Sequence, residues 1–295
     1  MTPPVTRRRF LTISAAALAA PARADDTRLW SGAGLGGALS VRLRGVDAAT
    51  WYRLTRRIAA LVDHTERQFS LFRDSALVRL NRDGRLAYPA PAFLSLCNLA
   101  GRIHHDTGGA FDPSVQVLWR AALDRADSAA ARRHVGWDRV SLSAAEIRLP
   151  PGMALTFNGI AQGWCADRIV DLLRTAGLTQ VLVDMGEIVG IGGPAPGHPW
   201  QAAIQSPEGR ELARVELADR ALATSSPRGT VLPDGRGHIL SPTGQAPVWS
   251  TVSVSAPSAA LADALSTGFC LMTRDAIART LAHHPAARCE ALIPA

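Results

Sequence analysis

The chain contains no lysine, because all 32 of its basic residues are arginine. This absence excludes mechanisms that need a lysine amine, such as Schiff-base chemistry, a Ser-Lys dyad and the phosphate-binding lysine of a P-loop. Hydrophobic residues make up 47% and charged residues 19% of the 295 positions. That is the composition of a globular protein, with room for one large domain or two ordinary ones.

Several metal and nucleotide signatures are missing as well. The four cysteines have no CxxC spacing, which excludes a zinc signature, and Cys97, Cys165 and Cys270 lie in apolar helical patterns typical of buried free thiols. The chain has neither a GxSxG nor an HExxH motif. Residues 32–37 match GxGxxG, but an alternating strand pattern follows where a dinucleotide site needs a helix. A Rossmann site is therefore not predicted.

Residues 1–24 indicate a targeting segment. An arginine run, Arg7 to Arg9, directly precedes Phe10, and the apolar run behind it is too short to span a bilayer, which takes about 20 residues. Ala22-Arg23-Ala24 has the form of a cleavage site. The segment is similar to a twin-arginine signal, which exports folded proteins, so we expect a periplasmic protein; a disordered basic tail is the alternative. Cleavage would lower the formal net charge from +7 to +3, which removes the main support for nucleic-acid binding.

The remaining residues, 25–295, are expected to form the folded domain. Residues 38–43 alternate as in a half-buried strand, and helical spacing runs from Asp47 to Phe69. Strands and helices then follow in irregular order, which favours an α+β fold of mixed sheets with packed helices over a parallel βαβ series. Further helices are expected at 91–105, 160–176, 259–272 and 274–283, and strands at 140–142, 147–149, 154–157, 180–191 and 289–293.

Two turns are candidates for a ligand site. In residues 107–113 a glycine pair allows the backbone to approach a ligand, and Asp112, which precedes proline, is expected to be extended with its carboxylate presented. An ordinary helix-to-turn connection is the alternative. Residues 158–164 lead from an expected strand into a helix N-terminus, where N–H groups can bind a phosphate. Asn158 could equally serve as the helix cap alone.

Two further segments carry groups suited to catalysis. Asp263 and Thr267 lie four residues apart on an expected helix, so a carboxylate and a hydroxyl share one face and could bind magnesium. The alternative is an exposed Asp and a Thr bonded to its own helix. His238 is expected on a short strand before a Pro-Thr-Gly turn, where it could act as a base or contact a phosphate, or be structural.

Seven segments, in this order, give the chain a family resemblance. They are LGG (35–37), FSLFRDSALVRLN (69–81), GGAFDPSV (108–115), FNGIAQGWCADRIVDLL (157–173), VDMGEIVGIGG (183–193), HILSPTG (238–244) and ADALSTGF (262–269). From about Leu35 to the last strand the chain resembles the ApbE family of FAD:protein FMN transferases. The resemblance implies an ApbE-like fold with an FAD cleft between two lobes.

The resemblance also implies an activity and the residues that perform it. Such enzymes split the pyrophosphate of FAD, transfer FMN to a Thr or Ser hydroxyl of another protein and release AMP, with magnesium required. By position, the catalytic residues would be His238 and Asp263. The resemblance places FAD at Leu35, Phe72, Ala110, Phe111, Asp112, Asn158, Trp164 and Leu240, and magnesium at Ala161 (through its carbonyl), Asp263, Ser266 and Thr267.

Three positions depart from the family pattern. Gln162 stands where lysine is common, Ser241 where aspartate is usual, and Gly186-Glu187 where two glycines are usual. The first two changes remove charge near the expected phosphates. They favour, as an alternative, a periplasmic flavin-binding or assembly protein without catalysis.

The expected partners are FAD and an exported acceptor protein with a Thr/Ser motif, for example a subunit of a membrane-bound electron-transfer complex. A second alternative within enzymes is an FAD pyrophosphate hydrolase, in which water replaces the acceptor hydroxyl and the products are FMN and AMP. The same residues would serve both reactions.

Overall fold

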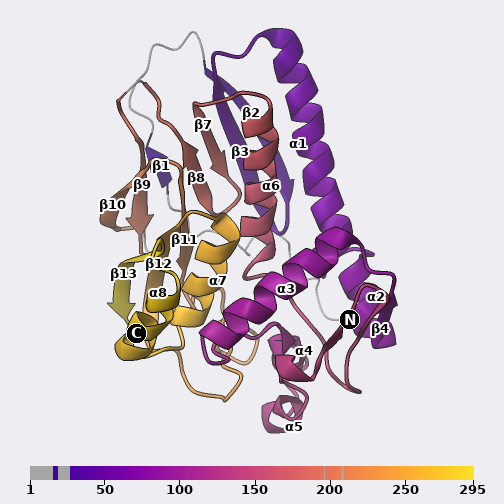
Figure 1. The fold of residues 1–295 in the computed structure, drawn as a ribbon. Helices are drawn as coiled ribbons and strands as arrows, with labels where there is room; N and C mark the ends of the chain where they lie inside the picture. The colour runs from indigo at the N-terminus through magenta and orange to yellow at the C-terminus, as the bar shows by residue number, and fades with distance from the viewer. Residues whose placement is uncertain (1–15, 19–26, 196, 207–208) are drawn as a thin grey trace.

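A seven-stranded sheet forms the centre of the molecule (Figure 1). The computed structural model describes residues 16–18, 27–195, 197–206 and 209–295. All neighbouring strands of this sheet are antiparallel, in the order β13-β12-β11-β8-β7-β3-β2. The strands are β2 (Thr27–Gly34), β3 (Gly37–Arg44), β7 (Val181–Asp184), β8 (Ile188–Ile191), β11 (Arg220–Ser225), β12 (Trp249–Ala256) and β13 (Arg288–Pro294).

The two faces of this sheet carry different layers. Strand residues alternate between faces, so Val181 and Val183 pack into the main core with the helices, and Leu182 points the other way. On that other face Leu182 and Ile188 pack against a three-stranded sheet, β1-β9-β10. The helices of the main core are α1 (Ala48–Phe69), α6 (Ala161–Thr175), α7 (Ala259–Phe269) and α8 (Arg274–His283), and the small sheet consists of β1 (Ala16–Leu18), β9 (Trp200–Gln205) and β10 (Glu211–Leu217).

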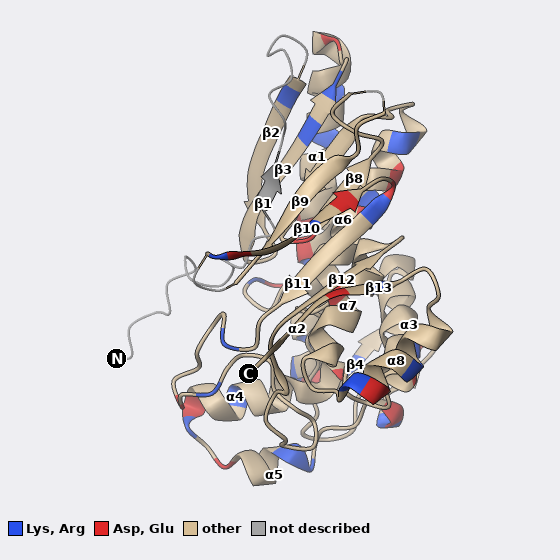
Figure 2. Ribbon diagram, turned by 90° about the vertical axis from the view of Figure 1, so that its left-hand side faces the viewer, with Lys and Arg blue, Asp and Glu red and all other residues tan. Residues whose placement is uncertain are grey.

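The other helices gather at one end of the main sheet, as Figures 1 and 2 show from two sides. Phe69 at the end of α1 stacks on Phe93, and both contact Phe157, so aromatic packing joins the two parts of the molecule. The elements of this part are α2 (Ala76–Asp83), α3 (Pro91–Asp106), α4 (Gln116–Asp124), α5 (Ser128–Arg132), and a sheet of β4 (Arg85–Ala87), β6 (Glu146–Arg148) and β5 (Ser141–Leu142).

Most of the expected elements are confirmed. The predicted α+β class is correct, and the predicted helices coincide with α1, α3, α6, α7 and α8 within a few residues. Local signals explain these bounds: Asp47 caps α1 by accepting a hydrogen bond from the backbone N–H of Thr50. Residues 32–37 form the β2–β3 hairpin with its turn at Leu35-Gly36, so the GxGxxG match opens no helix, as expected.

Three expected strands were wrong. Residues 154–157 are extended but pair with no strand, because the side-chain amide of Asn81 bonds both the N–H and the carbonyl of Leu155 at 2.7 and 2.8 Å. Residues 180–191 form two strands, since Gly186 adopts a positive φ of 100° and reverses the chain. His238 lies in a bend rather than a strand.

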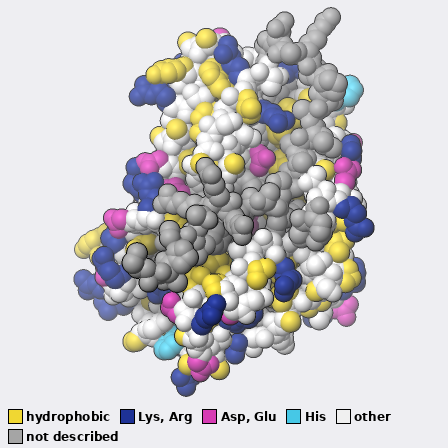
Figure 3. All heavy atoms as spheres, turned by 180° about the vertical axis from the view of Figure 1, so that it is seen from behind, with side chains coloured by type: hydrophobic (Ala, Val, Ile, Leu, Met, Phe, Trp, Pro, Cys, Tyr) yellow, Lys and Arg dark blue, Asp and Glu magenta, His cyan; other side chains and the backbone are white. Residues whose placement is uncertain are grey.

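The predicted signal segment lies outside the described residues, apart from Ala16–Leu18, which form β1 and pair with β9. Export therefore stays a prediction. None of the helices in the described part of the chain is both long and apolar enough to cross a membrane. Figure 3 shows the rear of the molecule, where arginines are interspersed with acidic and apolar side chains on the surface that is not grey.

Candidate active site

A large cavity lies where the main sheet meets the α2–α5 end of the molecule. Its empty volume, including the open space at its mouth, is about 1260 Å³. All but three of the residues predicted for catalysis, FAD or metal line it. Those that do are Leu35, Phe72, Ala110, Phe111, Asp112, Asn158, His238, Leu240, Asp263 and Thr267.

Apolar side chains form one end of the cavity. Leu35 stands in the β2–β3 turn with a φ of 51°, and its backbone N–H donates to the carboxylate of Glu66 on α1. Phe72, in the loop after α1, is 53% exposed. An exposed aromatic side chain and a leucine at a cavity mouth offer a planar apolar surface of the kind that a flavin ring can contact.

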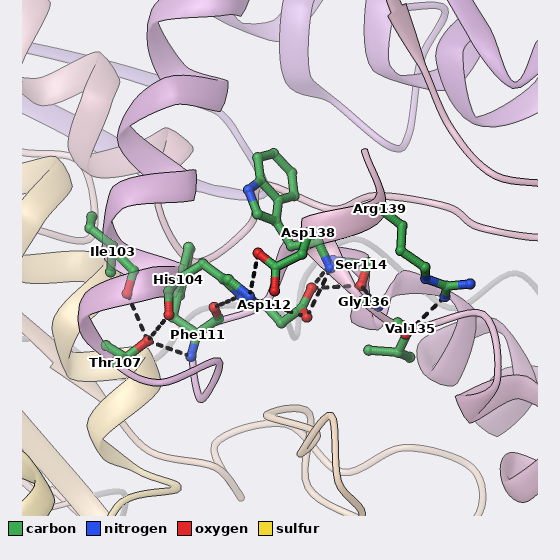
Figure 4. A network of polar contacts seen from close by, with 11 residues as sticks. Ile103, His104, Thr107, Phe111, Asp112, Ser114, Val135, Gly136, Asp138 and Arg139 are labelled. Atoms are coloured by element: carbon green, nitrogen blue, oxygen red, sulfur yellow. Dashed lines mark hydrogen bonds and ion pairs between the residues drawn. The ribbon is translucent and has the colours of Figure 1, made fainter. Parts of the chain in front are cut away.

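Buried polar contacts with α3 hold the loop between α3 and α4 in place (Figure 4). Thr107 Oγ1 accepts the N–H of Phe111 at 3.1 Å and donates to the carbonyl of Ile103 at 2.7 Å. His104, buried on α3, bonds the carbonyl of Phe111 through Nδ1 at 2.9 Å. His104 lies in the last turn of α3 and under the cavity wall, where its bond to Phe111 helps to hold the loop backbone.

Asp112 has the predicted extended backbone, with φ −137° and ψ 109°. Its carboxylate is turned inward, however, and is not presented to the cavity as expected. It accepts bonds from the N–H and hydroxyl of Ser114 at 2.7 and 2.6 Å and from the N–H of Trp137 at 3.3 Å (Figure 4). The backbone of this short 3₁₀ turn attracts the carboxylate because its first N–H groups have no helical partners.

Asp263 and Thr267 lie on α7, as predicted, and both face the cavity. Oδ2 of Asp263 lies 3.5 Å from the N–H of Gly163 in the first turn of α6, so the carboxylate itself takes the place at this helix N-terminus that a phosphate was expected to fill. A Cβ on Gly159 would lie 2.9 Å from Thr267 Oγ1. Glycine at 159 therefore lets the turn before α6 pass directly over the threonine hydroxyl.

Three predicted site residues lie outside the main cavity. Ser266 is fully buried, and its hydroxyl bonds Ser225 Oγ at 2.7 Å and the carbonyl of Asp263 at 3.0 Å, so it faces the sheet. Trp164 packs edge-on against Phe69 in the core. Ala161, the first residue of α6, lines a smaller adjoining cavity. Ala161 and Trp164 lie on α6 and Ser266 lies on α7, each within a turn of a residue that lines the cavity. Side chains within one helical turn point in different directions, which is why these three do not reach the main cavity.

Asn158 lines both cavities but does not cap α6. The residue at the cap position is Ile160, whose side chain makes no capping hydrogen bond. The exposed amide of Asn158 is thus available to a ligand rather than used by the backbone.

His238 is held at the cavity wall on both sides of its backbone. Its N–H donates to the carbonyl of Pro227 at 2.8 Å, and its own carbonyl accepts the indole N–H of Trp119 at 2.8 Å. Nδ1 lies 3.0 Å from the Pro227 carbonyl, which can only accept, so Nδ1 carries the proton of a neutral ring and Nε2 is left with its lone pair. Burial lowers the pKa of His238 and favours this neutral form.

The cavity is strongly acidic. Burial, and next the charge of Asp167, raise the pKa of Asp263, while the N–H of Gly163 opposes this shift. Burial is also the main cause of the raised pKa of Glu187, followed by the charge of Asp263. Of the described residues that line the cavity, none is arginine, and the chain has no lysine. Asp112, Glu187 and Asp263 thus line the cavity, the Asp112 carboxylate being turned away to Ser114, and no permanent positive charge lies among the described lining residues.

Several lining residues were not predicted. Trp119 comes from α4, a helix that was not expected, and Ser225 lies on β11 with its hydroxyl 3.3 Å from Thr267 Oγ1. Glu187 was noted only as a departure from the family pattern. A single serine or tryptophan has no distinguishing local pattern, whereas an acidic residue in an otherwise apolar hairpin was a visible signal.

Comparison with known proteins identifies the class. The described fold is that of flavin transferases: the flavin transferase ApbE from Vibrio cholerae superposes with a TM-score of 0.76 at 25% identity, covering 88% of this chain and 91% of that one. A Thermotoga maritima ApbE protein, at 21% identity and a TM-score of 0.78, shares the fold over 89% of this chain and 93% of its own.

Sequence comparison gives the family. The model of the ApbE family matches residues 35–293, so this chain belongs to the ApbE family. The FAD:protein FMN transferase of Klebsiella pneumoniae is 30% identical over 261 residues, 79% of this chain and 75% of that protein. The protein of the same name from Treponema pallidum is 30% identical over 75% of this chain and 71% of its own length. The resemblance read from the seven segments is thereby confirmed.

Proposed function

We propose that this chain is an FAD:protein FMN transferase that uses magnesium, moves FMN from FAD to a Thr or Ser hydroxyl of another protein and releases AMP. One observation carries the proposal beyond family membership. A carboxylate and a hydroxyl on α7 and a neutral histidine with a free Nε2 face the same acidic cavity. This set can hold a cation, a pyrophosphate and an attacking hydroxyl together.

The donor set supports a divalent cation. No three His, Cys, Asp or Glu side chains in the described parts of the chain gather into a group that could hold a metal ion. The available donors are instead the Asp263 carboxylate and the Thr267 hydroxyl, which are hard oxygen ligands, and magnesium commonly completes such a set with water and substrate phosphate. An anionic pyrophosphate cannot bind beside the Asp263 and Glu187 carboxylates unless a cation balances the charge.

His238, Asp263 and Thr267 would each have a separate role in the transfer reaction. Nε2 of His238 accepts the proton of the acceptor hydroxyl, whose oxygen forms a bond to the FMN phosphorus. The P–O bond to the AMP half breaks, and its electron pair leaves with AMP. Asp263 and Thr267 would hold the cation, which neutralises charge on the phosphate oxygens. The low pKa of His238 keeps the base unprotonated at neutral pH.

The remaining lining residues would bind FAD and exclude misplaced water. Leu35 and Phe72 offer the apolar contact surface for the flavin ring, and Ala110 and Phe111, on a loop held by buried hydrogen bonds, form a further part of the cavity wall. Asn158 supplies an uncommitted amide. Gln162 stands where the family commonly has lysine, and its side-chain amide N–H donates to the carbonyl of Met185 at 3.1 Å. Gln162 therefore adds no positive charge, and the cation must supply all the positive charge that balances the pyrophosphate.

We further propose that the enzyme is exported, on the strength of the twin-arginine-like segment at residues 1–24. The acceptor would then be an exported protein that presents its hydroxyl in a short flexible motif, for example on a membrane electron-transfer subunit.

The direct test uses the purified full chain with FAD and magnesium, with and without an acceptor domain that carries a Thr or Ser motif. We expect AMP release that depends on both magnesium and acceptor, and a covalently fluorescent acceptor band on a denaturing gel. AMP and free FMN at equal rates without acceptor would indicate the hydrolase instead. FAD binding with no AMP under any condition would indicate a flavin-binding protein.

A further inference from the structure

One oxygen of a buried carboxylate in the cavity has no hydrogen-bond partner. Glu187 stands in the β7–β8 turn, is 7% exposed and lines the cavity. Its Oε2 makes no hydrogen bond. Among the described residues only two other buried side-chain atoms, Gln68 Oε1 and Arg132 Nε, share this state, and neither residue lines the cavity. A buried charged oxygen without a partner is strongly unfavourable, so the site calls for a group that is missing from the protein itself.

The start of α6 brings this carboxylate next to Asp263. The Gln162 amide donates to Met185 in the turn that carries Glu187, and a Cβ on Gly186 would lie 3.2 Å from the same amide. The next residue, Gly163, directs its N–H to Asp263 Oδ2. Gln162 and Gly163, which are successive residues of α6, thus bond the β7–β8 turn that carries Glu187 and the carboxylate of Asp263, respectively. Among the neighbouring charges, that of Asp263 raises the pKa of Glu187 the most.

No protein group neutralises this pair. The cavity lining includes no arginine among the described residues, and burial lowers the pKa of its histidine, His238, although the Pro227 carbonyl opposes that shift. The side-chain amide N–H of Gln162 is already bonded to Met185. Two neighbouring carboxylates with a hydroxyl beside them form the oxygen set that a divalent cation prefers.

We propose that Glu187 is an additional ligand of the cation held by Asp263 and Thr267, so that this protein binds its metal through two carboxylates before FAD arrives. The inference rests on the proposed metal-dependent function. It deepens that function by making metal affinity a property of the protein alone. It also explains how the cavity tolerates the loss of charge at position 162, because a tightly held cation supplies that charge instead.

The test measures Mn²⁺ binding to the full chain without FAD, by electron paramagnetic resonance of the free ion, with magnesium as competitor. Glu187→Gln keeps the size of the side chain and removes its charge, and should raise the Kd for Mn²⁺ at least tenfold, as expected for loss of one charged ligand. Asp184→Asn is the matched control: it removes a carboxylate from the same turn that does not line the cavity, and should change the Kd less than threefold.

Thermal unfolding provides a second readout that a purely structural role would not reproduce. In metal-free buffer Glu187→Gln should melt at or above the wild-type temperature, because an unpaired buried charge is gone, and the rise in melting temperature on adding Mn²⁺ should shrink. A Kd within threefold of wild type, equal weakening by Asp184→Asn, or a lower melting temperature without metal would each overturn the inference. FMN transfer by the wild type is assayed separately, so the proposed function can fail while Mn²⁺ binding stands, or the reverse.

Discussion

At the scale of single residues, the chemistry concentrates on two side chains whose surroundings set their state. Asp263 is buried, yet one N–H at the start of α6 and the hydroxyl of Thr267 lie beside it. Burial and neighbouring negative charge raise the pKa of Asp263, which means that the empty site resists ionisation and a bound cation reverses that preference. Metal binding at Asp263 should therefore release protons and strengthen as the pH rises.

Asp263→Asn preserves the size of the side chain and removes its charge. We expect it to weaken magnesium binding and to slow FMN transfer at least about a hundredfold, because a cation ligand is lost at the phosphate. Thr267→Val removes a neutral ligand that water can replace, and should slow transfer less. Transfer rates measured across a magnesium titration check both variants. Normal turnover of Asp263→Asn at low magnesium would contradict the metal assignment.

Substitution of His238 should slow FMN transfer while leaving FAD affinity nearly unchanged. Because burial lowers the pKa of His238, the base form persists below the ordinary imidazole value of about 6.5, and kcat/KM should stay level above that pH and decline only below it. His238→Ala should remove this acid limb and lower transfer about a hundredfold or more, with FAD affinity within a few-fold of wild type. Rate–pH profiles and FAD titrations measure the two effects. Loss of FAD binding together with a lower melting temperature would show that His238 is structural.

At the scale of elements, the site depends on how closely α6 and α7 approach. Asp167 on α6 accepts the Ser258 hydroxyl at 2.7 Å and the first N–H groups of α7, from Ala259 and Ala260, at 2.7 and 3.1 Å. This carboxylate caps α7 from a neighbouring helix. It fixes α7 one turn before Asp263, so the metal face of α7 is set by a contact between helices.

Gly163 tests that approach. A Cβ at this position would lie 2.4 Å from the carbonyl oxygen of Ala259, so Gly163→Ala must push the two helices apart. Helix propensity alone predicts a gain of about 1 kcal/mol for this change, whereas overpacking predicts a loss of about 1–3 kcal/mol. We expect the loss, and a weaker metal affinity with it. Chemical denaturation measures the free energy of unfolding, with Thr175→Ala, at an exposed position of α6, as a near-neutral control. Stabilisation by Gly163→Ala would mean that α6 and α7 are not in close contact.

At the scale of the whole molecule, the site is assembled from segments that lie far apart in the chain. The cavity collects residues from the β2–β3 turn, the α3–α4 loop, α6, the β7–β8 turn, β11 and α7, and it is open to solvent at its mouth. A protein substrate requires this access, since its hydroxyl must reach the FMN phosphorus in line with the leaving AMP.

The proposed export makes a prediction for the cell. Deleting the gene should remove one or more covalently fluorescent flavin bands from the exported proteins. The wild-type chain should restore them, and a chain with Arg7→Lys and Arg8→Lys should not, because twin-arginine export reads that pair. Ultraviolet imaging of denaturing gels measures the bands. Bands that persist in a deletion strain without a second such enzyme would contradict the transferase assignment.

The sequence by itself determined five of the helices, several of the strands and the placement of Asp263 and Thr267 on one helix face. These features are local: apolar spacing specifies a helix of the length of α1, and a separation of four residues places Asp263 and Thr267 on one face wherever α7 packs. The ordered motifs likewise sufficed for the family, which the match over residues 35–293 confirms.

Only the tertiary structure decided which way the other candidate side chains point. Ser266 follows the metal face by sequence but bonds Ser225 across the sheet, and Asp112 turns from the cavity toward Ser114. His104 is buried beneath the wall of the cavity, where it bonds the Phe111 carbonyl. The buried Oε2 of Glu187, which has no hydrogen-bond partner, likewise becomes evident only in the packed molecule. Each outcome depends on partners distant in the chain, because burial and hydrogen bonding are properties of the packed molecule and leave no periodic trace in the sequence.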